Sequence, residues 1–190
     1  MSDRDRLRWD ERYASRGAPA PEAIGPPAVF APHAAAFPAG GHALDLACGQ
    51  GATAVWLARR GLSVRGLDVS PVAVEQARDL AARAGVEDRC HFEVVDLDDG
   101  LPPGPPADVI VCHRFRDRRL DRAITDRLVP GGLLAISALS AVGAAPGPFR
   151  AEPGELRAAF ADLTVIAAGE GDGEAWLLAH RAPLVDRHHE

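Results

Sequence analysis

The stretch Ala-Leu-Asp-Leu-Ala-Cys-Gly-Gln-Gly, residues 43–51, decides the fold of this chain. Its first four residues predict a short buried strand that carries one acid, Asp45. Gly49 and Gly51 permit backbone angles and close approaches that side chains forbid, and residues 52–60 predict a helix. Such a turn either simply reverses the chain tightly or binds a ligand, because the N–H groups at the helix start favour an anion while Asp45 favours a cation. A zwitterionic ligand suits both ends of this turn.

The length and composition of the chain indicate one folded domain. Its 190 residues are enough to bury one core and few for two. The formal net charge of -6 argues against a general nucleic-acid binder, whose surface carries a basic excess. The N-terminus is charged where a signal peptide is apolar, and the most apolar stretch, residues 133–145, is shorter than the ~18 residues of a membrane span. We therefore expect a cytoplasmic protein with no nucleic-acid or membrane partner.

The cysteines and the terminal histidines predict no metal site. Cys48, Cys90 and Cys112 are scattered without Cys-x-x-Cys spacing, so we expect free thiols rather than a disulfide framework or a zinc site. His188 and His189 lie at the chain end, where paired histidines are typical of a frayed tail or an expression remnant.

From residue 43 onward the sequence alternates between strand and helix patterns. We expect strands at residues 43–46, 63–67, 91–95, 108–112, 133–137, 164–168 and 175–180, and helices at 52–60, 71–84, 120–128 and 152–160. This alternation implies crossover connections and a parallel sheet with helices on both faces. The short joint at residues 170–173 predicts a β-hairpin, so the last strand should run antiparallel to its neighbour.

Acids follow three successive predicted strands at the edge where such sheets bind ligands. Asp45, Asp68 and Asp96 lie at the carboxyl ends of the first, second and third strands. Asp68 suits both hydroxyls of a ribose, Asp96 an exocyclic amine of a purine, and Asp45 an ammonium group. Three acids beside a glycine loop are better explained by a ligand site than by a solvated surface.

These motifs resemble those of the class I S-adenosylmethionine-dependent methyltransferases, over residues 9–180. The resemblance rests on residues 44–51 as the first motif, Gly-Leu-Asp-Val-Ser-Pro at 66–71, Val-Val-Asp-Leu at 94–97 and Leu-Val-Pro-Gly-Gly-Leu-Leu at 128–134. The chain is also similar to the small bacterial tellurite-resistance methyltransferases, which often begin with a Trp-Asp-x-Arg-Tyr segment like residues 9–13. Ala47 stands where the commonest first motif has its first glycine.

The resemblance implies a Rossmann-like α/β fold, with a seven-stranded, mostly parallel sheet, an antiparallel last strand and helices on both faces. It implies a helical lid and lead-in at residues 1–42, an S-adenosylmethionine-binding methyltransferase domain at 43–183 and a tail at 184–190. The residues expected to bind the cofactor are Trp9, Arg12, Tyr13, Asp45, Ala47, Cys48, Gly49, Gly51, Asp68, Val69, Asp96, Leu97 and Cys112.

The predicted lid leaves alternatives open. Trp9 and Tyr13 are four residues apart and share one face of a predicted helix, which covers either the cofactor or simply the sheet. Arg12 is expected to reach the methionyl carboxylate or to form a surface ion pair.

The expected reaction is direct in-line methyl transfer to a small-molecule acceptor. A sulfonium is already a good methyl donor, so the protein mainly holds donor and nucleophile in line and excludes water. His113 is the candidate catalytic base for an oxygen or nitrogen nucleophile, and the alternative is a packing histidine. A soft sulfur, selenium or tellurium acceptor needs no base. Cys112 is not expected to act as a nucleophile, since the sequence shows nothing that lowers its pKa.

Five arginines follow the fourth predicted strand, at positions 114, 116, 118, 119 and 122. Asp117 and Asp121 interrupt this run, so a solvated face is favoured over an anion site. If the run binds substrate, it favours an anionic small molecule. Residues 138–151 are few and rich in Gly and Pro, which predicts a small or exposed acceptor without a large capping domain.

Two other functions stay open at this stage. Residues 49–54 fit the pattern Gly-x-Gly-x-x-Ala, and Asp68 follows at the distance typical of NAD(P)-binding Rossmann oxidoreductases. Asp45, Asp96, the Pro-Gly-Gly turn and the terminal hairpin have no place in that fingerprint. A cofactor-binding protein without turnover is the third possibility, because a fold does not establish catalysis. The sequence leaves the oligomeric state open.

Overall fold

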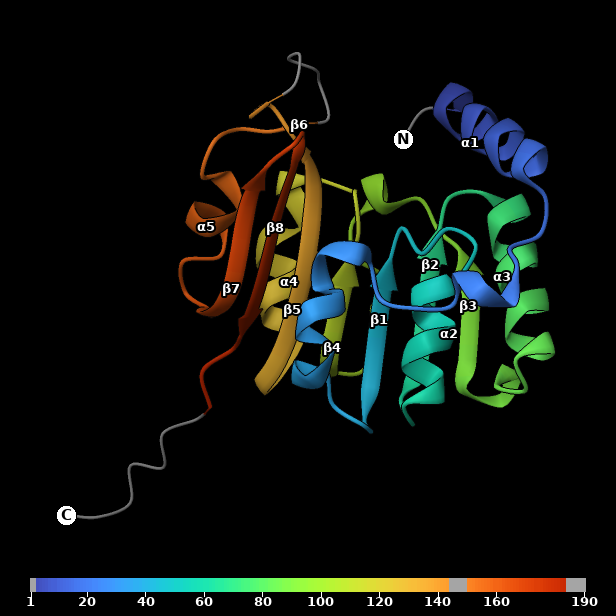
Figure 1. Ribbon diagram of the computed structural model, residues 1–190, viewed down its shortest axis with the longest axis horizontal. Helices are drawn as coiled ribbons and strands as arrows, with labels where there is room; N and C mark the ends of the chain where they lie inside the picture. Colours follow the sequence, from blue (N-terminus) through green and yellow to red (C-terminus); the bar gives the residue numbers. More distant parts are fainter. Residues whose placement is uncertain (1–2, 144–149, 184–190) are drawn as a thin grey trace.

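A single sheet forms the centre of the molecule (Figure 1). The computed structural model describes residues 3–143 and 150–183, so the expected tail at 184–190, with its two histidines, lies outside the described residues. Within these ranges the sheet has eight strands: seven follow the order β3-β2-β1-β4-β5-β8-β7, and β6 pairs with β5 beside this path. The strands are β1 (His42–Leu46), β2 (Ser63–Asp68), β3 (Cys90–Val94), β4 (Ala107–Cys112), β5 (Leu128–Ser140), β6 (Arg150–Ala151), β7 (Thr164–Gly171) and β8 (Glu174–His180).

The sheet is Rossmann-like and differs from the predicted one by a single short strand. The two-residue strand β6 lies in a stretch whose Gly and Pro content predicted only loop. β1 pairs in parallel with β2 and β4, while β8 runs antiparallel to β5 and β7, which confirms the predicted hairpin. The register places Leu46 opposite both Leu67 and Cys112. The carboxyl ends of the central strands therefore meet at one edge.

Helices connect the strands, and capping residues and glycines determine where these helices begin and end. The helices are α1 (Asp3–Arg16), α2 (Ala52–Arg59), α3 (Pro71–Arg83), α4 (Asp121–Arg127) and α5 (Glu155–Ala159), with the 3-10 helices η1 (Pro21–Ala23), η2 (Ala28–Ala36), η3 (Glu87–Arg89), η4 (Leu97–Asp99) and η5 (Arg118–Leu120). α3 begins as predicted, because Ser70 Oγ accepts a hydrogen bond from the Ala73 N–H at 3.2 Å and Pro71 fits the first turn. α5 is shorter than predicted, since Gly154 precedes it in the left-handed conformation.

The start of β5 differs from the prediction. Residues 130–132, Pro-Gly-Gly, were expected as a turn before a strand at 133–137, but β5 already begins at Leu128. The backbone of Arg181 explains this extension: the Gly131 N–H donates to its carbonyl at 2.8 Å, and its own N–H donates to the Gly132 carbonyl at 2.9 Å. A residue 50 positions along the chain thus supplies the partner that makes this segment extended.

Helices cover both faces of the sheet, but unevenly. η2, α2 and α3 lie on one face, where Phe30, Leu57 and Phe92 form part of the core (Figure 1). α4 packs on β5 and α5 on β8 at the other face. The connection from β3 to β4 contains only η4 and no α-helix. On this second face β2 and β3 therefore carry polar side chains, and Arg65 Nε bonds Glu93 Oε1 at 2.6 Å. Of the helices in the described ranges, none has the length and apolar character that crossing a bilayer requires.

Candidate cofactor and acceptor site

The glycine loop is tied to the carboxyl end of β2. The Gly49 N–H donates to Asp68 Oδ2 at 2.8 Å, and the Ser70 N–H donates to Asp68 Oδ1 at 2.9 Å. The Cys48 N–H donates to the Leu67 carbonyl at 2.9 Å. Each oxygen of Asp68 keeps lone pairs after these bonds, because a carboxylate offers about four acceptor positions. Asp68 can therefore hold the loop and still accept hydroxyl groups of a ligand.

Asp45 ends β1 as a buried carboxyl group with an unused oxygen. The residue is 2% exposed, and its Oδ2 has no hydrogen-bond partner within the described residues. Burial and the nearby Asp68 raise the pKa of Asp45 to about 8, while the Ala54 N–H opposes this shift. A buried acceptor without a donor is costly, and a cationic group placed beside it would relieve that cost. The donor set thus fits the ammonium group expected at this loop.

The glycines of the loop serve different purposes. A Cβ on Gly49 would lie 3.0 Å from the hydroxyl oxygen of Tyr13. A Cβ on Gly51 would lie only 2.7 Å from Ala77 Cβ, so Gly51 allows α3 to pack against the loop rather than making room for a ligand. Ala47 has a φ of +53°, which favours glycine and explains why the commonest first motif has glycine here.

Helix α1 lies across this edge, beside α3 (Figure 1). Its rings of Trp9 and Tyr13 stack with centroids 5.9 Å apart. Gln76 Nε2 donates to the Tyr13 carbonyl at 3.3 Å, Gln50 Nε2 donates to the Gly17 carbonyl at 2.7 Å, and the Ser70 hydroxyl donates to Asp10. Burial and the charge of Asp68 raise the pKa of Tyr13, so its hydroxyl stays protonated. The sequence analysis missed four residues that hold α1 in place: Asp10, Gln50, Ser70 and Gln76.

Arg12 contacts an aromatic ring of its own helix. Its guanidinium stacks over the Trp9 ring at 5.1 Å, a cation–π contact on the exposed side of α1. Within the described residues no carboxylate pairs with its guanidinium, and the contact with a methionyl carboxylate stays a prediction. The contact supports the orientation of Trp9.

The third acid lies beside the second. The Val95 N–H donates to the Asp68 carbonyl at 2.9 Å, which places Asp96 next to the end of β2. Asp96 Oδ1 accepts from the Asp98 N–H at 2.9 Å and so caps η4. Leu97 and Val69 are buried, at 4% and 8% exposure. Asp45 is thus the last residue but one of β1, Asp68 ends β2 and Asp96 comes two residues after β3, so the three acids lie near the carboxyl ends of neighbouring strands, as predicted.

Burial keeps two cysteine thiols of the site protonated. Burial raises the pKa of Cys112, with a further contribution from Asp45, and its Sγ donates to the Phe115 carbonyl at 3.3 Å. Burial and the charge of Asp45 also raise the pKa of Cys48 well above its usual value. Neither group forms a thiolate near neutral pH, so nucleophilic catalysis by cysteine is disfavoured.

His113 emerges from β4 into a polar cluster. Its Nδ1 lies 2.7 Å from Ser137 Oγ, which also accepts the Arg114 N–H at 3.1 Å. Glu174 Oε1 lies 3.9 Å from the same Nδ1. Burial lowers the pKa of His113, Arg114 lowers it further, and Glu174 opposes both. The imidazole is therefore neutral near pH 7. Sequence reasoning missed Ser137 and Glu174; Ser137 is a polar residue in the apolar run of β5, and Glu174 directly precedes the strand predicted at 175–180.

The arginine run is a set of ion pairs. Arg114 pairs with Glu174, Arg118 with Glu155, Arg119 with Asp117 and Asp98, and Arg122 with Asp126. The expected solvated face is wrong for Arg116, whose side chain is 2% exposed and bonds both Asp121 and Glu155. Carboxylates from β8, η4, α4 and α5 thus neutralise the run, which removes the reason to expect an anionic acceptor.

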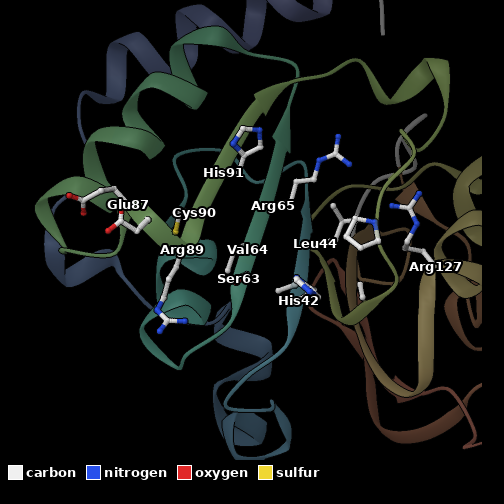
Figure 2. Close-up of a pocket in the computed structure, with 14 residues that line it drawn as sticks. His42, Leu44, Ser63, Val64, Arg65, Glu87, Arg89, Cys90, His91 and Arg127 are labelled. Atoms are coloured by element: carbon white, nitrogen blue, oxygen red, sulfur yellow. The ribbon is translucent and has the colours of Figure 1, made fainter.

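A hollow of about 380 Å³ lies at the opposite edge of the sheet (Figure 2). It is lined by the amino-terminal halves of β1, β2 and β3 together with Arg127 at the end of α4. The Nη2 group of Arg127 donates to the Pro102 carbonyl at 2.8 Å, and Nη1 of Arg65 donates to the Pro103 carbonyl at 2.8 Å. None of the predicted site residues lines it, so the hollow is separate from the glycine loop.

Comparisons with known proteins identify the domain. Residues 43–132 match a family model described as a methyltransferase domain. The methyltransferase GfsG of Streptomyces halstedii is 37% identical over 106 residues, which cover 52% of this chain and 38% of GfsG. The 27-O-demethylrifamycin SV methyltransferase of Amycolatopsis mediterranei is 36% identical over 104 residues, which cover 52% of this chain and 38% of that protein. Other relatives are named ribosomal protein L11 methyltransferases. The matches span about a third of the length of these relatives.

The solved structures share the fold. TehB from Haemophilus influenzae superposes with a TM-score of 0.66 at 19% identity, over 74% of this chain and 57% of TehB. Residues 43–132 therefore match a methyltransferase domain, and the chain shares its fold with a solved S-adenosylmethionine-dependent methyltransferase from Mesorhizobium loti.

Proposed function

We propose that this protein transfers the methyl group of S-adenosylmethionine to a small-molecule acceptor by direct in-line displacement. The observation that carries the proposal is the buried, unpartnered Oδ2 of Asp45 beside the glycine loop. It suits an ammonium group, and Asp68 on the neighbouring strand keeps lone pairs for ribose hydroxyls. When bound, the cofactor supplies a methyl group on a sulfonium, which is a good leaving group.

The cofactor contacts are proposed for the carboxyl edge of the sheet. Asp45 would hold the amino-acid end, Asp68 the ribose and Asp96 the adenine. The backbone of residues 47–51 would line the amino-acid end, with Val69, Leu97 and Cys112 as apolar neighbours. α1 would act as a lid through Trp9 and Tyr13, since Tyr13 lies over Gly49. The protein's own contribution to the reaction is to position donor and acceptor and to exclude water.

A small molecule is the proposed acceptor. The name of the rifamycin relative supports this class, whereas the names of the L11 relatives make a protein acceptor the competing outcome. His113 emerges beside the end of β1, because Leu46 pairs with Cys112, and it is the proposed base. Since the arginine run is neutralised internally, the acceptor needs no negative charge.

Cofactor binding can be tested at Asp68. We expect Asp68→Ala to weaken S-adenosylmethionine binding tenfold or more, through loss of about 1.4 kcal/mol or more of hydrogen bonding to the ribose. Isothermal titration calorimetry measures this. Asp99→Ala is the matched control, because Asp99 is an exposed acid in η4 with the same charge. Unchanged affinity of the Asp68 variant would refute the ribose contact, and tight binding of NAD without binding of S-adenosylmethionine would refute the proposed function.

Turnover separates an enzyme from a cofactor-binding sensor. The unmodified protein is incubated with S-adenosylmethionine and a panel of phenols, alcohols, amines, thiols and chalcogen oxyanions, and methylated products are identified by mass spectrometry. Product from at least one small acceptor supports the proposal. Cofactor binding without product from this panel would favour the sensor, and methylation of an added ribosomal protein alone would favour a protein acceptor.

A further inference from the structure

A buried carboxylate oxygen without a partner lies beside His113. Glu174 is the first residue of β8, and its Oε1 has no hydrogen-bond partner within the described residues. Its other oxygen, Oε2, accepts from Arg114 Nη2 at 3.1 Å. An unsatisfied buried acceptor costs about 1–3 kcal/mol, so its presence calls for an explanation.

The free oxygen of Glu174 faces one particular nitrogen of the imidazole. It lies 3.9 Å from His113 Nδ1, and that nitrogen also lies 2.7 Å from Ser137 Oγ. Both oxygens are on the protein side of the ring. In the described residues Nε2 has no hydrogen-bond partner, and the side chain is 34% exposed. Nδ1 thus has protein partners, whereas Nε2 is available to a ligand.

Electrostatics decides which nitrogen carries the proton of the neutral ring. Ser137 Oγ already accepts the Arg114 N–H at 3.1 Å, and its hydroxyl can either donate to Nδ1 or accept from it. The negative charge of Glu174 favours the arrangement in which Nδ1 carries the proton, because it attracts a proton to the nearer nitrogen. With the proton on Nδ1, Nε2 carries a lone pair and can act as a base.

We infer that Glu174 is a positioning residue that holds His113 in the Nδ1–H tautomer, and that the acceptor therefore reacts through a group that must lose a proton, such as a hydroxyl, rather than through a soft sulfur. The claim about the acceptor rests on the proposed methyl transfer, whereas the claim about the tautomer does not. The acceptor O–H bond breaks and its proton goes to Nε2, while the oxygen forms the new bond to the methyl carbon. The electron pair of the broken carbon–sulfur bond stays on sulfur. The imidazolium that results has an N–H on each nitrogen, and Glu174 stabilises the one on Nδ1.

The tautomer can be tested without any cofactor or acceptor. Nitrogen-15 NMR of histidine-labelled protein distinguishes the two ring nitrogens, and we expect the Nδ1–H form for His113 in the unmodified protein. Glu174→Gln should shift the ring to the Nε2–H form, because the new amide can donate to Nδ1. Glu170→Gln removes the same charge from the same hairpin, where Glu170 contacts Ser140 and Gly154, and should leave His113 unchanged. An Nε2–H ring in the unmodified protein, or no response to Glu174→Gln, overturns the inference.

The acceptor class is tested by kinetics. For a hydroxyl acceptor, Glu174→Gln should lower kcat about tenfold or more with little change in KM, while the rate with a thiol acceptor stays the same. Because Glu174 raises the pKa of His113 against burial and Arg114, its removal should also move the acidic limb of the kcat profile to lower pH. Glu174→Asp should restore part of the rate, and equal melting temperatures confirm folding.

The outcomes separate the two proposals. If the unmodified protein methylates no acceptor, the proposed function fails while the NMR result still decides the role of Glu174. If Glu174→Gln slows thiol and hydroxyl acceptors equally, the residue is structural and the inference is wrong, although methyl transfer stands.

Discussion

Asp45 and Glu174 each carry one buried carboxyl oxygen that no donor satisfies within the described residues. Asp45 lies near the end of β1 and Glu174 at the start of β8, and β4 and β5 separate these two strands in the sheet. Neither position is favoured by the packing around it, because an unsatisfied buried acceptor lowers stability. Residues that reduce stability at a ligand-binding edge are best explained by the ligands they meet.

The pH dependence of stability tests the state of Asp45. A carboxyl group whose pKa rises from 3.8 to about 8 on folding stabilises the protein at low pH, and this contribution is lost as the pH rises towards 8. Asp45→Asn cannot ionise. Relative to the unmodified protein, we expect its free energy of unfolding to be higher at pH 8.5 than at pH 5 by about 1 kcal/mol or more.

Urea unfolding of both proteins at the two pH values measures this difference. Asp99→Asn serves as the control, since its side chain is exposed and its substitution should give the same small change at both pH values. An Asp45→Asn effect that does not depend on pH would mean that the carboxyl group of Asp45 is ionised throughout this range.

At the scale of elements, the sequence predicted the first half of the sheet well. The strands and helices from β1 to β4 begin and end within one residue of the prediction, because apolar runs, Ser70 and the glycines act locally. The extent of β5, the strand β6 and the polar cluster around His113 could not be predicted in this way. The extension of β5 depends on Arg181, and Ser137 meets His113 only through sheet pairing. Such contacts leave no spacing in the sequence.

The packing of α3 against the glycine loop gives a prediction at this scale. Gly51 has a φ of +82°, and a Cβ there would lie 2.7 Å from Ala77 Cβ; Gly85 has a φ of +69° with open space around it. Both alanine variants strain the backbone, at about 1 kcal/mol each. Gly51→Ala should cost about 1–3 kcal/mol more, because it also overpacks α3. Denaturant unfolding measures both variants, and equal losses would show that the loop tolerates the contact by shifting.

At the scale of the whole molecule, the two kinds of helix–sheet contact differ in strength. α2 and α3 bury apolar side chains against the sheet. By contrast, α1 contacts the rest of the protein mainly through Asp10, Tyr13 and Gly17, the residue that follows the helix. Polar contacts of this kind contribute about 1 kcal/mol each. α1 is therefore expected to open locally, while β1, β4 and β5 open only when the protein unfolds.

Hydrogen exchange with mass spectrometry tests this view of α1 as a lid. Without cofactor, amides of α1 should exchange much faster than those of β4, whose residues Val109, Ile110 and Val111 are fully buried. Saturating S-adenosylmethionine should slow exchange in α1 about tenfold or more, which corresponds to ~1.4 kcal/mol of added closure. NAD at the same concentration should have no effect. If α1 is as protected as β4 without cofactor, or if the cofactor leaves its exchange unchanged, then Trp9 and Tyr13 simply pack on the sheet and α1 is a fixed part of the fold.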